Sequence, residues 1–163
     1  MGFAGRIATV AAVIAVAGLA LASAGPIKAA MTGEAAIKAR VHLMKENGKN
    51  MKAIQGFVKS GKGTAAEVAK HAAGIAADAK KIPSLFPKDT GRGHFTDKQT
   101  RALPAIWTDW KGFEKDSHAL MVAAEHLEKV AKAGDKDAIA KAAGGVGKAC
   151  GACHKAYRGP EVD

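Results

Sequence analysis

Residues 150–154 read CGACH, a C-x-x-C-H motif close to the end of a 163-residue chain. This spacing is the attachment pattern of c-type haem, in which two thiols form thioether bonds to the haem vinyl groups and the adjacent imidazole binds the iron. On a helix, positions i, i+3 and i+4 share one face. The motif therefore predicts one haem c, bound covalently through Cys150 and Cys153, with His154 as an iron ligand.

Three other uses of a C-x-x-C pair fit the sequence less well. A structural zinc site takes four ligands, and these are the only two cysteines in the chain. A thioredoxin-like redox pair expects a βαβ context, whereas no strand pattern surrounds the motif. A disulfide between residues so close in sequence closes a very small loop and stabilises little. Haem attachment is therefore the preferred interpretation.

The N-terminal residues 1–24 have the features of a secretory signal peptide. Arg6 supplies a positive charge, residues 7–21 are uncharged and mostly apolar, and residues 22–24 read ASA, a small-x-small cleavage pattern. We expect cleavage to leave a periplasmic domain of residues 25–163, with no stable membrane insertion. The alternative is an uncleaved anchor, because the uncharged stretch 7–26 approaches the length that spans a bilayer.

The chain is strongly basic, with 25 Lys and Arg residues against 15 Asp and Glu residues. The lysines are scattered along the chain and do not form one block. Nucleic acid is the usual inference from such a charge, but the predicted export argues against it. We expect an acidic redox partner, with a merely solvated basic surface as the alternative.

Four amphipathic segments predict an all-α fold. Aromatic content is 5%, alanine is abundant, and β-branched residues form no alternating runs. The first segment covers residues 33–60, and the second opens at a capping box in residues 64–67 and ends near Pro83. The third opens at Pro104 and is broken at residues 134–137, and the fourth carries the C-x-x-C-H motif. We expect an antiparallel four-helix bundle with the covalently attached haem in its interior.

Two details of these segments bear on the site. Residues 84–103 form a long connection without periodicity, and we expect Leu85, Phe86 and Phe95 to hold it to the core, either over a haem edge or by packing alone. In the first segment, apolar residues at steps of three and four predict the buried row. That row consists of Ile37, Val41, Met44, Met51, Ile54 and Val58.

The second axial ligand of the iron decides its chemistry. A methionine thioether gives a six-coordinate, low-spin centre suited to one-electron transfer, whereas an apolar residue leaves a five-coordinate iron open to small gases. Met44 is in the predicted buried row, but a methionine there is more often a core residue than a ligand. The residues alone leave Met31, Met44, Met51, Met121 and five further histidines as candidates.

The sequence resembles the four-helix c-type cytochromes, that is, the cytochrome c′ group and its low-spin, methionine-ligated relatives. The matching residues are CGACHKAYR at 150–158, PAIW at 104–107, and R-x-x-x-M-x-x-x-G at 40–48. They span essentially the whole predicted mature chain. The position of C-x-x-C-H on the last helix discriminates more than the motif, because most small cytochromes c carry it near the N-terminus.

The resemblance implies that the residue four positions after the first-helix arginine faces the open side of the iron. Five-coordinate members have a bulky apolar residue there, whereas this chain has Met44, which implies His154/Met44 ligation, with Met51 as the next candidate. Arg40 and Arg158 each lie one turn from a predicted ligand. We expect them at the haem propionates or the polar rim of the pocket, with ordinary exposed arginines as the alternative.

These expectations combine into a function. We predict a periplasmic one-electron carrier and not an enzyme, because a filled sixth position blocks substrate and the sequence places no general acid over the haem. The alternative is a five-coordinate, cytochrome c′-like protein that binds nitric oxide or carbon monoxide, with Met44 near the iron but not bonded to it. Bundles of this family also form homodimers through outer helix faces, but the apolar rows here assign no such face.

Overall fold

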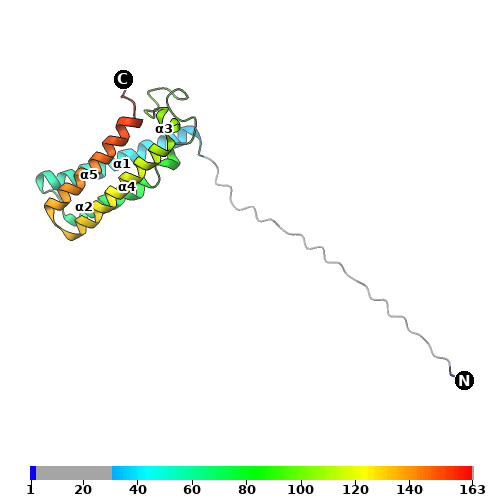
Figure 1. Cartoon of the computed structure of the whole chain (residues 1–163), viewed down its shortest axis with the longest axis horizontal. Helices are drawn as coiled ribbons and strands as arrows, with labels where there is room; N and C mark the ends of the chain where they lie inside the picture. The colour runs from blue at the N-terminus through cyan, green and yellow to red at the C-terminus, as the bar shows by residue number, and fades with distance from the viewer. Residues whose placement is uncertain (3–30, 163) are drawn as a thin grey trace. The chain divides into compact units, whose positions relative to one another are not determined.

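The computed structural model describes residues 1–2 and 31–162, and most of the predicted signal peptide lies outside the described residues. The described part is helical, without a β-strand, which confirms the predicted fold class (Figure 1). None of its helices is both apolar and long enough to cross a membrane. The elements are α1 (Gly33–Ser60), α2 (Ala65–Ala79), the 3₁₀ helix η1 (Pro83–Leu85), α3 (Ala105–Thr108), α4 (Trp110–Ala133) and α5 (Lys136–Tyr157).

The four long helices lie along one another as a bundle (Figure 1). Short turns join α1 to α2 and α4 to α5, so the helices of each pair run in opposite directions. The closest packing is between α2 and α4, followed by α4 with α5 and α1 with α2. In contrast, α1 packs only lightly on α5. The bundle is therefore most open along the seam between its first and last helices.

The sequence signals for the helix ends act as expected. The Thr64 hydroxyl accepts a hydrogen bond from the backbone N–H of Glu67, whose carboxylate accepts one from the backbone N–H of Thr64, and this confirms the capping box. Gly61 and Gly134 end α1 and α4 in the left-handed conformation, with φ of 67° and 84°. The Asp135 side chain then caps α5.

The third predicted helix is divided in two. A short helix follows Pro104 as expected, but the backbone leaves the helical conformation at Asp109, with φ −122° and ψ 52°. The Asp109 carboxylate accepts a hydrogen bond from the backbone N–H of Gly112 at 3.2 Å and caps a new helix, α4. A side chain that satisfies a free N–H competes with continuation of the helix, which explains the break.

The predicted buried row of α1 is wrong at two positions. Val41 is 42% exposed and Val58 is 38% exposed, while Leu43 and Phe57 occupy the core. The cause is the burial of polar side chains, which an apolar pattern does not register. The residues of α1 that face the interior are Ala36, Ile37, Arg40, Leu43, Asn47, Ile54 and Phe57. Met44 and Met51 consequently lie half-buried at the edge of this face.

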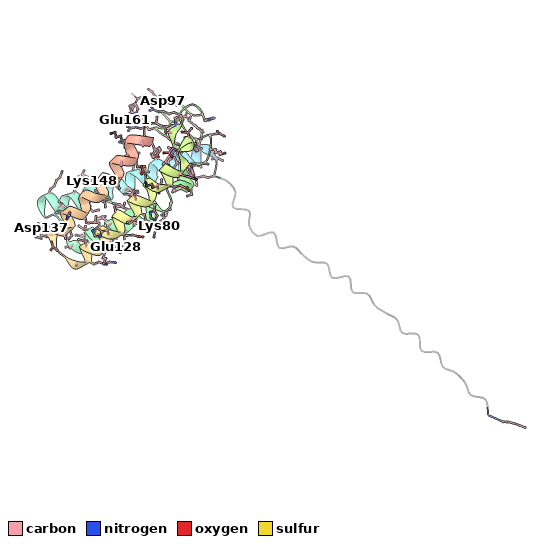
Figure 2. The ribbon with its side chains drawn as sticks, in the orientation of Figure 1. Lys80, Asp97, Glu128, Asp137, Lys148 and Glu161 are labelled. Carbon is pink, nitrogen blue, oxygen red and sulfur yellow. The ribbon has the colours of Figure 1, made fainter. Side chains whose placement is uncertain are left out.

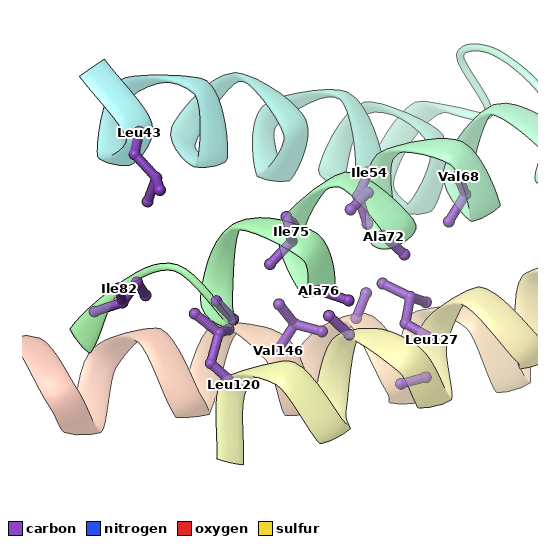
Figure 3. Packing of buried hydrophobic residues seen from close by; sticks show 14 of the residues in the cluster. Leu43, Ile54, Val68, Ala72, Ile75, Ala76, Ile82, Leu120, Leu127 and Val146 are labelled. Carbon is purple, nitrogen blue, oxygen red and sulfur yellow. The ribbon is translucent and has the colours of Figure 1, made fainter. Parts of the chain in front are cut away.

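The core fills the space between the helices. Ile54, Ile75, Leu127 and Val146 come from α1, α2, α4 and α5 and have no exposed surface (Figure 3). One polar contact crosses this region, since the Ser117 hydroxyl donates to the backbone oxygen of Ala79 at 2.8 Å. This hydrogen bond ties α4 to the end of α2 without leaving a buried hydroxyl unpaired.

The long connection between η1 and α3 is pinned to the bundle as the sequence predicts. Phe86 is buried, Leu85 packs against the core, and the ring of Phe95 lies against Gly33 at the start of α1. The indole N–H of Trp107 donates to the backbone oxygen of Phe86 at 3.1 Å. The segment therefore has a defined position across one end of the bundle.

Truncation of a core side chain far from the C-x-x-C-H motif tests this packing. We expect Leu127→Ala to lower the free energy of unfolding by about 3 kcal/mol, because it removes buried methyl groups and leaves a cavity. Chemical denaturation at constant pH measures the change. Val122→Ala on the same helix is the control, since Val122 is 48% exposed and its truncation should cost less than about 0.5 kcal/mol. Equal losses in the two variants would contradict the assigned core.

Candidate haem site

A cavity of about 420 Å³ lies at the end of the bundle, between α1, α5 and the connection that follows η1. Apolar side chains form part of its wall, namely Phe86, Ile106 and Phe113. The lining also includes five residues that the sequence predicts for the site: Arg40, Met44, Cys153, His154 and Arg158. The structure thus brings together side chains from the first helix and from the last, which are far apart in the sequence.

A second hollow, of about 500 Å³, lies on α2 and α4. Alanines make up most of its lining, and the lining contains no cysteine, histidine or methionine. It therefore lacks the side chains that attach a haem or bind its iron, and we assign no function to it.

The C-x-x-C-H motif lies in the last two turns of α5. Cys150, Cys153 and His154 are all half-buried, and neither cysteine forms a disulfide. Cys153 and His154 line the cavity directly, while Cys150 packs against the adjoining core. The helical spacing expected from the sequence is therefore present in the structure.

The cysteine thiols are in a largely apolar environment. Burial raises the pKa of Cys153 to about 11, and the nearby charges of Asp116 and Cys150 act in the same direction. Burial also raises the pKa of Cys150. Both side chains are therefore neutral thiols at neutral pH rather than the thiolates that metal sites and redox-active pairs use.

The surroundings of His154 favour its neutral imidazole. Burial lowers its pKa, and the positive charges of Arg158 and Arg101 lower it further. The neutral imidazole has a free nitrogen lone pair, which is what an axial ligand requires.

Met44 lines the same cavity from α1. Among the residues that line it, Met44 is the only methionine and His154 is the only histidine. The two side chains come from different helices, α1 and α5. Met51, the next candidate from the sequence, packs against the core and does not line the cavity.

The remaining methionines and histidines lie elsewhere. Met31 is exposed, and Met121 packs on the core outside the cavity. The ring of His71 hydrogen bonds with the side-chain oxygen of Asn50 at 2.9 Å. The exposed histidines are His42, His94, His118 and His126. None of these residues lines the cavity.

Arg40 has a structural role that the sequence did not reveal. Its guanidinium donates to the Thr100 hydroxyl at 2.7 Å, to the Thr90 hydroxyl at 2.9 Å and to the backbone oxygens of Thr90 and Leu85. It also lies 4.6 Å from the ring centre of Phe86. The side chain is only 4% exposed, so the expectation of an ordinary exposed arginine is wrong here. Arg40 joins α1 to the connection that forms one wall of the cavity.

The buried charge of Arg40 bears on whether a haem fits. Burial lowers the pKa of Arg40 to about 10. Every hydrogen bond that it makes among the described residues is to a neutral oxygen, and no carboxylate pairs with it. A haem carries two propionate carboxylates, which complement such a cation. Together with two thiols, an imidazole and apolar walls, this donor set fits haem c.

Arg158 differs from Arg40 in its surroundings. It is exposed, lines the cavity, and makes no ion pair with any residue in the described range. Its backbone N–H donates to the carbonyl oxygen of His154 at 3.1 Å, at the end of α5. The position is compatible with the expected rim role, and the contact with propionate stays a prediction.

Tyr157 anchors the end of α5. Its hydroxyl donates to a carboxylate oxygen of Asp109 at 2.7 Å, and its ring meets the Phe113 ring edge-on with centroids 5.4 Å apart. The bond to Asp109 raises the pKa of Tyr157 to about 12. Because Asp109 also caps α4, this contact fixes the helix that carries the motif against the start of its neighbour. The sequence gave no signal for the partner of Tyr157.

Removal of the Arg40 guanidinium tests its joining role. We expect Arg40→Met to lower the free energy of unfolding by about 2 kcal/mol, because the threonine and carbonyl oxygens lose their buried donor. We also expect faster proteolysis within residues 86–102. Lys38→Met is the control, since Lys38 is an exposed cation on the same helix. An Arg40 variant with the stability and proteolysis rate of the control would show that the guanidinium does not hold the connection.

The Tyr157–Asp109 contact predicts a dependence on pH. The pKa of Tyr157 rises from 10.0 to about 12 in the folded protein, so its stabilising effect is complete below pH 10 and is lost as the pH rises toward 12. At pH 8 we expect Tyr157→Phe to be less stable than the unmodified protein by about 1 kcal/mol. Denaturation curves at several pH values give the difference. A difference that does not change between pH 8 and 12 would contradict the assigned bond.

Comparison with known proteins identifies the family of this chain. The family described as Cytochrome C' matches residues 35–158. The cytochrome c′ of Pararhodospirillum photometricum is 34% identical over 125 residues, which are 77% of this chain and 97% of the relative. The family match over residues 35–158 covers the seam, the connection and the C-x-x-C-H motif together.

Solved structures agree with the bundle. A cytochrome c′ with ligand-controlled dimer dissociation has a TM-score of 0.72 and 30% identity, over 79% of this chain and 98% of that one. A nitric oxide complex of a variant of cytochrome c prime from Alcaligenes xylosoxidans has a TM-score of 0.69 and 27% identity, over 79% and 98%. The chain therefore belongs to the cytochrome c′ family, whose members carry covalently attached haem c.

Proposed function

We propose that this protein is a periplasmic haem c protein that binds a small gas, nitric oxide or carbon monoxide, at an iron held by His154. The observation that carries the proposal is the family match over residues 35–158, with relatives named cytochrome c′ and one of them solved as a nitric oxide complex. Gas binding is therefore placed before one-electron transfer, whereas the sequence favoured one-electron transfer. The names of these relatives do not indicate the methionine-ligated branch expected from Met44.

Each side chain of the motif has a separate task in this proposal. Cys150 and Cys153 hold the haem through thioether bonds, and His154 supplies a neutral imidazole to one side of the iron. When bound, the haem supplies a metal centre that takes a diatomic ligand in its remaining position. On the α1 side, Val41 and Met44 bound the cavity. Their side chains form the apolar part of the α1 wall.

The two arginines are candidates for the haem propionates. Arg40 offers a buried cation without a carboxylate partner among the described residues, and Arg158 offers an exposed cation at the end of α5. A propionate near Arg40 would lower the cost of burying its charge. Arg40 would then bind the connection and the haem at once.

A second function, one-electron transfer, has a specific observation in its favour. Met44 is the only methionine that lines the cavity with His154. A thioether bonded to the iron would close the sixth position and favour electron transfer without a change of ligands. Neither function requires a substrate to be transformed, so we do not propose an enzyme.

Localisation and assembly follow from the same proposal. Residues 1–24 direct export to the periplasm by their sequence pattern, and cleavage after residue 24 releases the domain of residues 25–163. A homodimer is a second expectation, because a structural relative is described by the dissociation of its dimer. Sedimentation with and without carbon monoxide measures both the assembly and its response to a ligand.

Ligand binding to the ferrous protein separates the two functions. If the sixth position is open, the ferrous protein takes up one carbon monoxide per haem at neutral pH, and Met44→Leu leaves its absorption spectrum unchanged apart from small shifts. A shape-conserving replacement keeps the fold, since such swaps usually cost less than about 1.5 kcal/mol. Absorption titration of both proteins measures the result.

The opposite outcome identifies an electron carrier. A sharp low-spin spectrum, slow uptake of carbon monoxide and a gain of binding in Met44→Leu would show that the sulfur occupies the iron. Met51→Leu is the control, because Met51 is half-buried on the same helix but outside the cavity. The control should behave as the unmodified protein under either function.

A further inference from the structure

We propose that the mouth of the haem cavity is a docking surface for an acidic redox protein that delivers single electrons to the haem. The docked partner loses one electron and the iron goes from ferric to ferrous, with no bond formed or broken and no proton transferred. The inference rests on the haem occupying the cavity, as in the proposed function. It does not depend on whether gas or Met44 occupies the sixth position.

The lining of the cavity is rich in positively charged side chains. Among the described residues, five cationic side chains line the cavity and only one carboxylate does, that of Glu161. Glu161 is paired with Arg101 at 3.4 Å, so it neutralises one of the five. Arg40 lies at the buried base of the cavity. We call the other four residues the basic rim: Lys45, Lys98, Arg101 and Arg158.

Some cations elsewhere on the bundle are paired with carboxylates. Lys132 meets Glu128 at 2.6 Å and Lys80 meets Glu125 at 3.0 Å. At the cavity, Lys45, Lys98 and Arg158 have no ion pair with any residue that the structure describes. Figure 2 shows Glu161 at the end of the bundle where α5 finishes, and Glu128 toward the opposite end. Three exposed cations without an ion pair among the described residues therefore line this one cavity.

The neighbouring acidic groups do not cancel the rim. Asp97 lies at the same end of the bundle and pairs with Arg92 at 3.4 Å. Glu46, next to Lys45 in sequence, bonds to Lys49 at 2.6 Å. Both carboxylates are thus already matched with cations outside the rim. Lys45, Lys98 and Arg158 therefore keep their positive charge at the mouth of the cavity.

The placement of the rim favours a protein partner over a free anion. Its members come from three separate segments, namely α1, the connection before α3, and the residues after α5. Lys45, Lys98 and Arg158 are exposed, so a large surface can reach all three. Cys153 and His154 of the haem motif line the same cavity as these three residues. A partner seated on the rim lies over the haem, where electron transfer needs it.

Physical chemistry predicts how such a surface acts. Complementary charges mainly raise the association rate, by roughly 10- to 1000-fold for strongly steered pairs, and the effect falls with ionic strength. Exposed charges are screened over about 10 Å at an ionic strength of about 0.1 M. The rim should therefore show itself in second-order rates at low salt.

Charge reversal on the holoprotein tests the proposal. The rim variant is Lys45→Glu with Lys98→Glu, and the control is Lys129→Glu with Lys141→Glu, which changes the net charge equally. Lys141 lies thirteen residues before His154 on α5, or about 20 Å along the helix. Lys129 is likewise exposed, toward the end of α4. Absorption spectra first establish that both variants contain haem.

The probe is reduced flavodoxin, an acidic flavoprotein that donates one electron at a time. Stopped-flow reduction of the ferric protein should be slower in the rim variant by at least about fivefold at low salt, and by less than about twofold in the control. The difference should disappear at high salt, because screening removes the steering. Equal losses in the two variants, or no loss in either, would overturn the proposal.

Two further measurements keep the outcomes distinct. Carbon monoxide titration of the same samples tests the proposed function. If carbon monoxide does not bind but the rim variant is still reduced more slowly than the control, the proposed function fails and the docking surface stands. Sedimentation with vesicles that contain anionic lipid tests a membrane as the occupant. Binding to vesicles that depends on the rim, with an unchanged flavodoxin rate, would replace the protein partner by a lipid surface and refute the proposal.

Discussion

The guanidinium of Arg40, buried among oxygens of the connection after η1, is the interaction on which the cavity depends. The other contacts of α1 with the rest of the site are light packing on α5, contacts with η1 and the contact of Gly33 with Phe95. The four hydrogen bonds and the Phe86 ring offset the cost of burying a charge. One side chain thus joins the helix of Met44 to the wall that carries Lys98 and Thr100.

The densely packed part of the bundle and the part that holds the cavity are different regions. The dense contacts lie between α2 and α4 and between α4 and α5, where fully buried aliphatic side chains fill the interior. The seam between α1 and α5 is open and holds the cavity. A large cofactor needs such a gap, because a close-packed interior has no room for it. The bond of Tyr157 to Asp109 then fixes the motif-bearing end of α5 beside this gap without filling it.

Most of the fold could be predicted from the sequence because its signals are local. The capping box at Thr64 and the glycines at 61 and 134 act within a few residues, and the C-x-x-C-H spacing has its meaning on any helix. The predictions failed where distant polar groups decide the structure. The burial of Arg40 depends on oxygens fifty and sixty residues later in the chain, and no periodicity contains that information. The error at Val41 and Val58 has the same origin, since buried Arg40 and Asn47 turn the inner face of α1 away from the apolar row.

This turn of α1 also explains why one residue separates the two candidate functions. If the apolar row had faced the core, neighbours would have locked Met44 in place. With Arg40 buried instead, Met44 lies half-buried at the cavity edge, and its unbranched side chain can take more than one position. The backbone therefore brings a sulfur to the wall of the cavity. If a haem fills the cavity as proposed, the position of this one side chain would decide whether the sixth position of the iron is open or closed.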